Sequence, residues 1–220
     1  MANTFAPFGF RQFGTLEGNA PTYGLTRRVI ASSDTQTYFT GDVVALSTGQ
    51  GAGFGFLTQP ASGLNTGVPI IGIFAGCEFF SPAVGRVVWS SFFPGNLGTS
   101  SSPCNAYVIE GEDNLFLVQT TTTAQIGTSN IGMNFGFTTG QTGSSQTGGN
   151  TTTGISNIAL LSSSPAVGGT TNSSFAFRLV DTSSSWAPPG TNGTDGTSAG
   201  SIVLVSFNNS ARRATAGISS

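Results

Sequence analysis

The chain lacks two residue types on which much enzyme chemistry depends. Among its 220 residues there is no histidine and no lysine, and only 7% of the residues are charged. Histidine is the usual general base near neutral pH, and lysine is the usual amine nucleophile. Their absence excludes a Ser-His-Asp triad, a P-loop and histidine-ligated zinc. We therefore predict that the protein is not an enzyme and that it needs no cofactor and no metal.

Two classes of partner also lack support in the sequence. The formal net charge is −2, and arginines adjoin one another only at Arg27–Arg28 and Arg212–Arg213, so no basic patch is available to neutralise phosphates. No uninterrupted apolar run reaches the roughly 18 residues of a membrane-spanning helix, and the N-terminus lacks the basic and apolar regions of a secretory signal. We expect a soluble chain that binds neither nucleic acid nor membrane.

The cysteine content is low. The two cysteines, Cys77 and Cys104, are too few for a disulfide scaffold, and Cys77 lies within an apolar run. A small buried hydrophobic role is the simplest interpretation of Cys77. We predict that both are free thiols, and a bridge between them remains the alternative.

What the chain has in abundance indicates β-structure. It contains 32 glycines and 18 phenylalanines, and no amphipathic helical period is visible. Short β-branched or apolar runs end at turn residues, which is typical of strands. These runs are 26–31, 41–47, 68–80, 85–96, 105–120, 131–137, 154–161, 175–180 and 201–207. We predict an all-β fold, a β-sandwich or a jelly-roll-like barrel.

Three of these runs support more detailed predictions. The runs 68–80 and 85–96 are apolar at both alternating sets of positions, which predicts strands that are covered on both faces. The run 105–120 resembles a hairpin closed by the turn residues of EGEDN. In 131–137 the alternate positions Ile131, Met133, Phe135 and Phe137 are apolar, which predicts one buried face.

The chain divides into an arm and a domain. Residues 1–25 carry glycine or proline every few positions, so they predict an extended N-terminal arm without helix or strand. Residues 26–220 form the predicted β-sandwich domain, with a subdivision near 122 as a further option. Two stretches rich in Gly, Ser and Thr, 138–154 and 182–200, are longer than ordinary loops and are candidates for function.

Acidic residues offer two weak candidate sites. Glu110, Glu112 and Asp113 cluster in the predicted turn, where they form a solvated hairpin tip or, alternatively, bind Ca²⁺. Glu78 stands among aromatic residues, so it is a candidate glycosidase acid, but its eight-residue spacing from Arg86 favours an ion pair across a hairpin. The GAGFGF segment (51–56) precedes no helix and is not interpreted as a phosphate loop.

Aromatic residues are the candidate partner-binding sites. Because long apolar strands with little charge need cover, other chains are expected to supply it. We predict that four phenylalanines of the arm anchor another subunit, with packing onto their own domain as the alternative. Trp186, beside Pro188 and Pro189, is a further candidate for docking. The predicted set is Phe5, Phe8, Phe10, Phe13 and Trp186.

The segments FAPFGFRQFGTLEGNAPTYGLTRRVIASSDTQTYFTGDVVALSTG and PIIGIFAGCEFFSPAVGRVVWSSFFPGN resemble a group of virion structural proteins of tailed bacteriophages, cyanophages among them. The resemblance extends loosely to 105–120 and to the final strand, so it covers most of the chain. It implies an accessory capsid protein of the decoration or cement type. Such a protein is assembled in the host cytoplasm and binds the major capsid protein on the exterior of the virion. We expect a homotrimer, with a dimer as the alternative.

A carbohydrate-binding or adhesive β-sandwich associated with a tail or fibre is the competing function. In that case exposed aromatic residues would stack on sugar rings. The candidates are Trp186, Tyr107 and the aromatic residues of 89–93.

Overall fold

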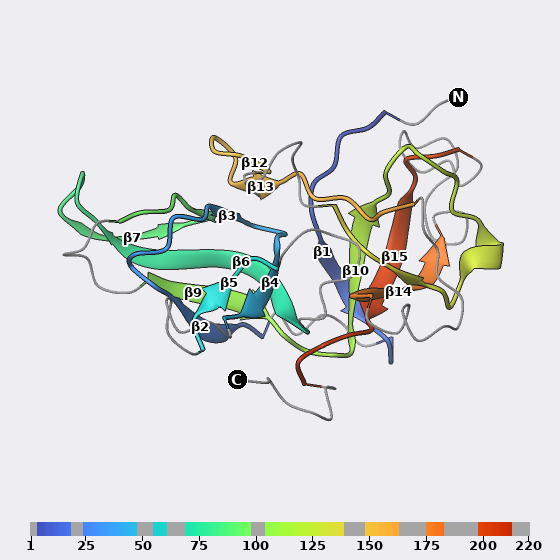
Figure 1. Ribbon diagram of the computed structural model, residues 1–220, viewed down its shortest axis with the longest axis horizontal. Coiled ribbons are helices and arrows are strands. Elements are labelled where there is room, and N and C mark those ends of the chain that lie inside the picture. Colours follow the sequence, from blue (N-terminus) through green and yellow to red (C-terminus); the bar gives the residue numbers. More distant parts are fainter. Residues whose placement is uncertain are drawn as a thin grey trace.

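The computed structural model describes residues 4–18, 24–47, 55–60, 69–97, 104–138, 148–162, 175–182 and 198–212. In these residues the fold is all-β, as predicted, and consists of antiparallel sheets that pack together (Figure 1). The only helical element in these ranges is one short 3-10 helix, η1 (Thr128–Asn130). None of their helices is long and apolar enough to cross a membrane.

Five strands form the sheet on the right of Figure 1, which we call the β10 sheet. In spatial order they are β1 (Arg11–Thr15), β10 (Asn114–Gln119), β15 (Ile202–Phe207), β14 (Phe177–Thr182) and β11 (Asn134–Phe135). Strands from the two ends of the chain, β1 and β15, therefore flank β10.

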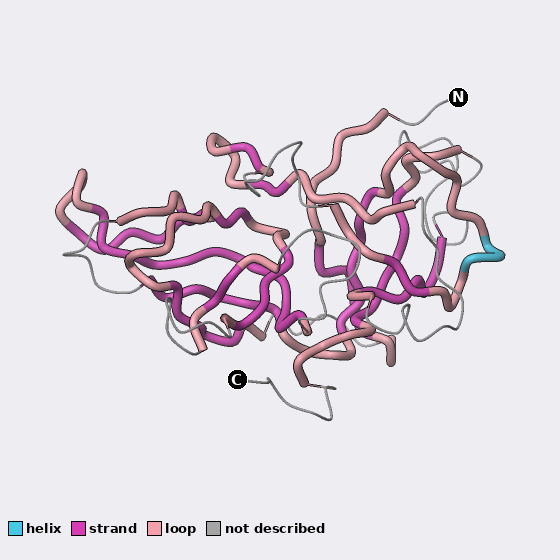
Figure 2. Tube along the Cα trace, viewed as in Figure 1, coloured by secondary structure: helices cyan, strands magenta, loops and turns pink. Residues whose placement is uncertain are grey.

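A second sheet on the left, which we call the β6 sheet, contains most of the other strands. In spatial order they are β2 (Thr26–Ile30), β9 (Cys104–Ile109), β6 (Ile70–Ser81), β4 (Val43–Leu46) and β5 (Leu57–Thr58), while β7 (Arg86–Ser90) pairs with the end of β6. Two small ribbons complete the fold (Figure 2). They are β3 (Tyr38–Phe39) with β8 (Phe92–Phe93), and β12 (Gly149–Asn150) with β13 (Ile155–Ser156).

The two sheets share a hydrophobic core. Phe116, Phe177 and Phe207 of the β10 sheet belong to the same buried cluster as Val43 and Ile73 of the β6 sheet. A second cluster lies between the β6 sheet and the β3–β8 ribbon and contains several aromatic and aliphatic residues, among them Tyr38, Phe74, Val108 and Phe93. The first part of β6 is thus covered on both faces, as its sequence predicts.

Strand β7 differs from this prediction. It forms the predicted hairpin with β6, but its outer face is not covered: Val87 and Trp89 are exposed. The hairpin extends past the rest of the β6 sheet, at the left end of Figure 1, so no other described strand packs over it. A similar difference affects 131–137, where Phe135 and Phe137 are buried but Ile131 is exposed beside η1.

The segment 105–120 is not a hairpin. Strands β9 and β10 are present, but β9 pairs with β2 and β6, whereas β10 pairs with β1 and β15. The residues between them carry the chain from one sheet to the other. This prediction was wrong because two apolar strands joined by a short turn give the same local pattern whether they pair with each other or not.

The predicted arm is also partly incorporated into the fold. Residues 11–15, where no strand was predicted, form β1 and pair with β10. One glycine of the predicted arm is a site of close packing: Gly9 has φ +71°, and a Cβ atom there would lie 2.7 Å from Cβ of Ser156. Only glycine fits this position, because it tolerates positive φ and leaves room for the neighbouring chain.

The two cysteines are buried and free, as predicted. A hydrogen bond to Cys104, together with burial, raises the pKa of the Cys77 thiol. The Cys77 thiol also lies 3.6 Å from the carbonyl oxygen of Phe92. Both residues contribute to the second cluster as small apolar side chains.

Candidate functional site

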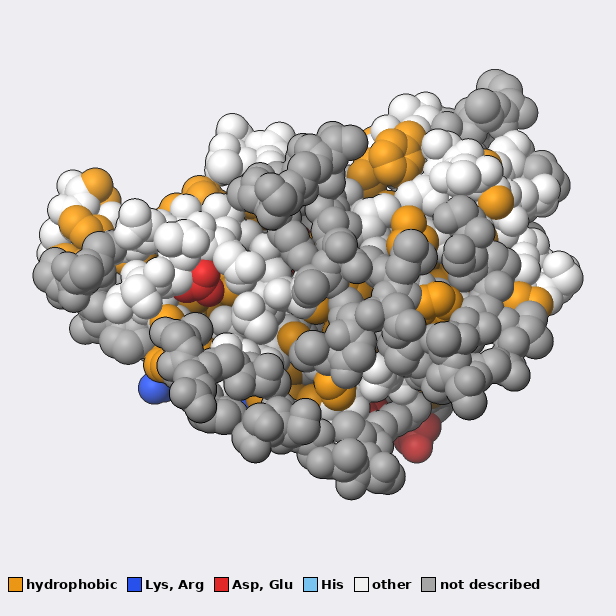
Figure 3. All heavy atoms as spheres, viewed as in Figure 1, with side chains coloured by type: hydrophobic (Ala, Val, Ile, Leu, Met, Phe, Trp, Pro, Cys, Tyr) orange, Lys and Arg blue, Asp and Glu red, His pale blue; other side chains and the backbone are white. Residues whose placement is uncertain are grey.

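Large apolar side chains are exposed mainly in two regions. One group lies in the N-terminal segment and contains Phe5, Phe13, Leu16 and Leu25. The other lies on the β6–β7 hairpin and contains Phe80, Val84, Val87 and Trp89. Figure 3 shows hydrophobic side chains at the surface of the hairpin end and over the N-terminal segment, on a face with few charged groups. Exposed apolar patches of this kind are common at binding surfaces.

The backbone of the N-terminal segment is fixed on its own chain. The buried side chain of Gln119 binds it twice: its Oε1 accepts from the N–H of Ala6 at 2.9 Å, and its Nε2 donates to the carbonyl of Thr4 at 2.8 Å. The N–H of Phe10 donates to the carbonyl of Gly41 at 3.0 Å. The segment is therefore ordered before any partner binds.

The four predicted anchors of this segment have different positions. Phe5 and Phe13 are 49% and 46% exposed, and Phe13 is the extra residue of a β-bulge between Gln12 and Gly14. Phe8 is half-buried, and Phe10 is only 1% exposed. Phe10 thus follows the alternative interpretation, packing onto its own domain. Trp186, the fifth predicted residue, lies outside the described residues, as do 139–147 and 183–197 of the two long loops.

The exposed face of the β6 sheet combines aromatic and polar side chains. Glu78 of β6 pairs with Trp89 on β7 and with Asn105 on β9. In the next row, Gly76 pairs with Tyr107, which pairs with Arg27 on β2. Directly paired residues project from the same side of a sheet. We call the surface formed by these residues the Trp89 face: Arg27, Gly76, Glu78, Trp89, Asn105 and Tyr107.

Two contacts define the geometry of the Trp89 face. The indole of Trp89 covers Gly76, where a Cβ atom would lie 2.8 Å from Cζ2 of the indole. On the other side of Gly76, the Tyr107 hydroxyl forms a hydrogen bond with Glu78, which raises the pKa of Tyr107. The structure thus brings together Trp89 and Tyr107, two of the predicted sugar-stacking residues. It was not predicted from the sequence that Glu78 lies on the same face as these two residues. The period of two along 76–80 does indicate that Gly76 and Glu78 share one face.

The predicted pairing of Glu78 with Arg86 is not observed. Arg86 lies opposite Ser81, three residues along the hairpin, and Glu78 lies opposite Trp89. No ion pair joins Glu78 to Arg86, both of which are described. The spacing predicted the hairpin correctly but not its register.

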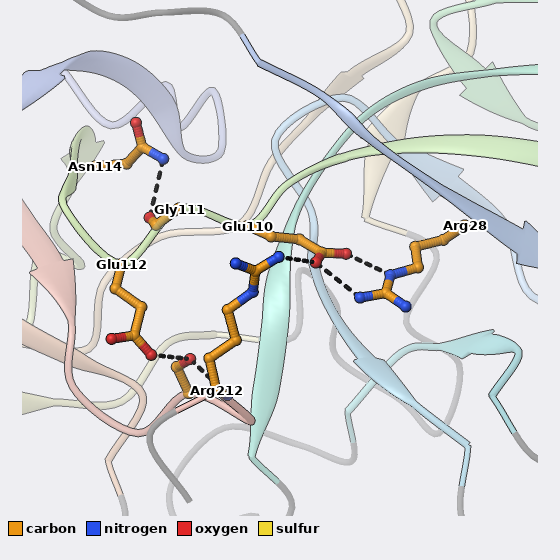
Figure 4. Close-up of polar contacts among 7 residues, drawn as sticks. Arg28, Glu110, Gly111, Glu112, Asn114 and Arg212 are labelled. Carbon is orange, nitrogen blue, oxygen red and sulfur yellow. Dashed lines mark hydrogen bonds and ion pairs between the residues drawn. The ribbon is translucent and has the colours of Figure 1, made fainter.

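Glu110 is a buried ion-pair centre and not part of a solvated turn. Its carboxylate accepts from Nε and Nη2 of Arg28 at 2.5 and 2.8 Å, and from Nη2 of Arg212 at 3.0 Å (Figure 4). The hydrogen bond to Glu110 raises the pKa of Arg28. Glu110 directly follows β9, the last strand of the β6 sheet in the sequence. Its ion pairs therefore connect this position to β2 through Arg28 and to the C-terminal segment through Arg212.

The acids of this turn do not form a cation site in the described part of the chain, where no group of three or more acidic or cysteine side chains could hold a metal. The carboxylate of Glu112 lies apart from that of Glu110 and accepts from the hydroxyl of Ser210 at 3.3 Å. The turn itself is closed by Asn114, whose Nδ2 donates to the carbonyl of Gly111 at 2.9 Å.

We expect Glu110→Gln to lower the free energy of unfolding by about 2 kcal/mol, the range for hydrogen bonds to charged groups. The cost is moderate because both arginines are partly exposed and regain water. Urea denaturation followed by circular dichroism measures the loss. Glu112→Gln, on the same turn, is the matched control and should cost less than 1 kcal/mol. Equal losses in the two variants would contradict a specific stabilising role for the ion pairs of Glu110.

Comparison with protein-family models, with curated proteins and with solved structures found no match to this chain.

Proposed function

We propose that the protein is a non-catalytic structural protein of a phage virion, a decoration or cement protein that binds the outside of the major capsid shell. The observation that carries this proposal is the N-terminal segment. Phe5 and Phe13 expose their rings on a backbone that Gln119 and β10 already hold in place. Anchors on an ordered backbone bind without the full entropic cost of ordering a loose chain.

The arrangement of apolar surface supports the same proposal. The exposed apolar residues lie in two separate regions, so attachment through the N-terminal segment leaves the β6–β7 hairpin accessible on the outside of the shell. Low charge and an all-β fold suit a protein with a purely mechanical role. Self-association, as a trimer or as a dimer, is part of the proposal, since local threefold positions of icosahedral shells favour trimers. The resemblance to virion proteins of tailed phages points in the same direction.

The double variant Phe5→Ser, Phe13→Ser tests the attachment. We expect binding to purified capsids to weaken by at least tenfold, because each buried phenylalanine contributes roughly 1.5–3 kcal/mol. Co-sedimentation of the protein with capsids that lack it measures the change. Circular dichroism should remain unchanged, since both rings are exposed in the free chain.

Ile131→Ser is the matched control, because Ile131 is exposed to a similar degree but lies beside η1, away from the N-terminal segment. It should bind capsids like the wild type. Failure of the wild-type protein to co-sediment with capsids, or absence of the protein from purified virions by mass spectrometry, would refute the proposed function.

A further inference from the structure

The Trp89 face has a preformed aromatic platform. Trp89 is 61% exposed although its indole lies against the backbone at Gly76, so the ring is supported from below and open above. Gly76 has φ +141°, next to a register shift between β6 and β9, and a side chain at this position would displace the indole. The platform therefore depends on a glycine at residue 76.

Side chains that can donate or accept hydrogen bonds surround this aromatic platform. The Glu78 carboxylate lies in the same row as Trp89 and Asn105, and the hydroxyl of Tyr107 bonds to it. Arg27, an exposed residue, pairs with Tyr107 from the neighbouring strand. A carboxylate, an amide, a phenol and a guanidinium together supply both acceptors and donors, and the two opposite charges leave the face without net charge.

We propose that the Trp89 face binds a carbohydrate, with a pyranose ring stacked on the indole of Trp89 and its hydroxyl groups hydrogen-bonded to Glu78, Asn105 and Arg27. The C–H groups of one side of a pyranose complement the negative face of an indole. The hydroxyl groups of the pyranose both donate and accept hydrogen bonds, so they can pair with the donors and with the acceptors of the Trp89 face. Binding sites of this kind combine an apolar surface with a few placed polar groups.

The position of Glu78 favours a sugar over a protein partner. Protein interfaces are depleted of charged residues at their centres, because a covered carboxylate needs compensating hydrogen bonds. Glu78 lies in the middle of the face, between Trp89 and Asn105. Sugar hydroxyl groups donate to a carboxylate directly, whereas an apolar protein surface leaves it without partners. The apolar residues Phe80 and Val87, on the same side of the hairpin, extend the stacking surface toward its end.

This inference goes beyond the proposed attachment to capsids and uses a different surface. The N-terminal segment faces the shell in the proposed function, and the Trp89 face belongs to the other sheet. Binding is measured on the free protein, so a negative result for sugars leaves the capsid experiment unaffected, and the reverse is also true.

The test uses the full chain on an array of immobilised oligosaccharides that includes β-glucans, galactosides, N-acetylhexosamine polymers and acidic bacterial polysaccharides. We expect binding to at least one class of pyranoside, with an affinity that falls at least tenfold in Trp89→Ala and to a smaller extent in Glu78→Gln. Trp89→Phe should retain part of the affinity, because a smaller ring still stacks. Val84→Ala, in the turn of the same hairpin and outside the Trp89 face, is the matched control and should bind within twofold of the wild type.

Three results would overturn the inference. The first is the absence of binding to any sugar on the array. The second is binding that survives Trp89→Ala, or that is lost in Trp186→Ala instead, which would place the site elsewhere. The third is a Trp89→Ala variant that loses attachment to capsids and leaves sugar binding intact, which would identify the Trp89 face as a protein interface. Circular dichroism of each variant checks that the sheet is folded.

Discussion

Phe10→Ala is expected to be among the most damaging single substitutions in this chain, with a loss of about 3–5 kcal/mol in the free energy of unfolding. Phe10 stacks on Phe177 with ring centroids 4.2 Å apart and meets Phe137 edge-on at 6.4 Å. It belongs to the cluster that both sheets share. Removing the ring leaves a cavity that the surrounding side chains fill only in part.

Phe13→Ala, three residues further along the chain and within β1, is the control. Its ring is largely exposed, so the loss should stay below about 1 kcal/mol, the range for exposed substitutions. Equilibrium unfolding in urea measures both variants. A loss below 1 kcal/mol for Phe10→Ala would show that the N-terminal segment does not belong to the core. The same geometry leads us to expect that deletion of residues 2–13 unfolds the β10 sheet, because it removes Phe10 and part of β1.

The second large effect concerns Asp42, an acid buried beside the turn between β3 and β4. Its Oδ2 accepts from the N–H of Phe39 at 2.8 Å and lies 3.5 Å from Nε2 of Gln59, while Oδ1 is buried without a hydrogen bond. Burial raises the pKa of Asp42 to about 7. The folded protein therefore holds a proton that the unfolded chain releases near pH 4.

The sign of the pH dependence follows from this difference. Between about pH 4 and pH 7 the folded state binds more protons at Asp42 than the unfolded state, so this group lowers stability as the pH rises and adds no further change above about pH 7. Asp42→Asn removes the titration. We expect the stability of the variant, relative to the wild type, to increase by about 3 kcal/mol between pH 5 and pH 8.

Urea denaturation of both proteins at pH 5, 6, 7 and 8 gives this difference. Asp113→Asn, which removes a negative charge from an exposed position, is the control for the general effect of charge. A difference between Asp42→Asn and the wild type that stays constant with pH would refute the assignment of a raised pKa to Asp42.

Several strands could be predicted from the sequence because their local hydrophobic pattern is compatible with only one type of secondary structure. Strand β15 follows the run 201–207, and the first part of β6 is apolar at every position and covered on both faces. The structure of the N-terminal segment could not be predicted in this way. Gly9 was interpreted as a joint of a free arm, but it is required where the segment packs against Gly41 and Ser156. A glycine that allows mobility and one that allows close approach look alike in a sequence.

Pairing between strands was less predictable than the strands themselves. The pattern of 105–120 indicates two strands and a turn, but it contains no information about which partners each strand has in the fold. The same limit affected the candidate site. Tyr107 and the aromatic residues of 89–93 could be named as stacking residues, but only the register of β7, β6 and β9 brings Trp89, Glu78 and Tyr107 onto one face.

The position of β10 between β1 and β15 also constrains the order of folding during synthesis. The strands of the β6 sheet lie within residues 26–109, so the ribosome completes them before β10 emerges. The β10 sheet cannot form completely until β15, which ends at Phe207, has been synthesised. Before that, one edge of β10 is unpaired and the ring of Phe10 lacks part of its buried cluster. Pairing between segments so distant in the sequence is slow and leaves apolar surface exposed. We expect nascent chains that stop before residue 202 to contain a folded β6 sheet and to depend on chaperones for solubility.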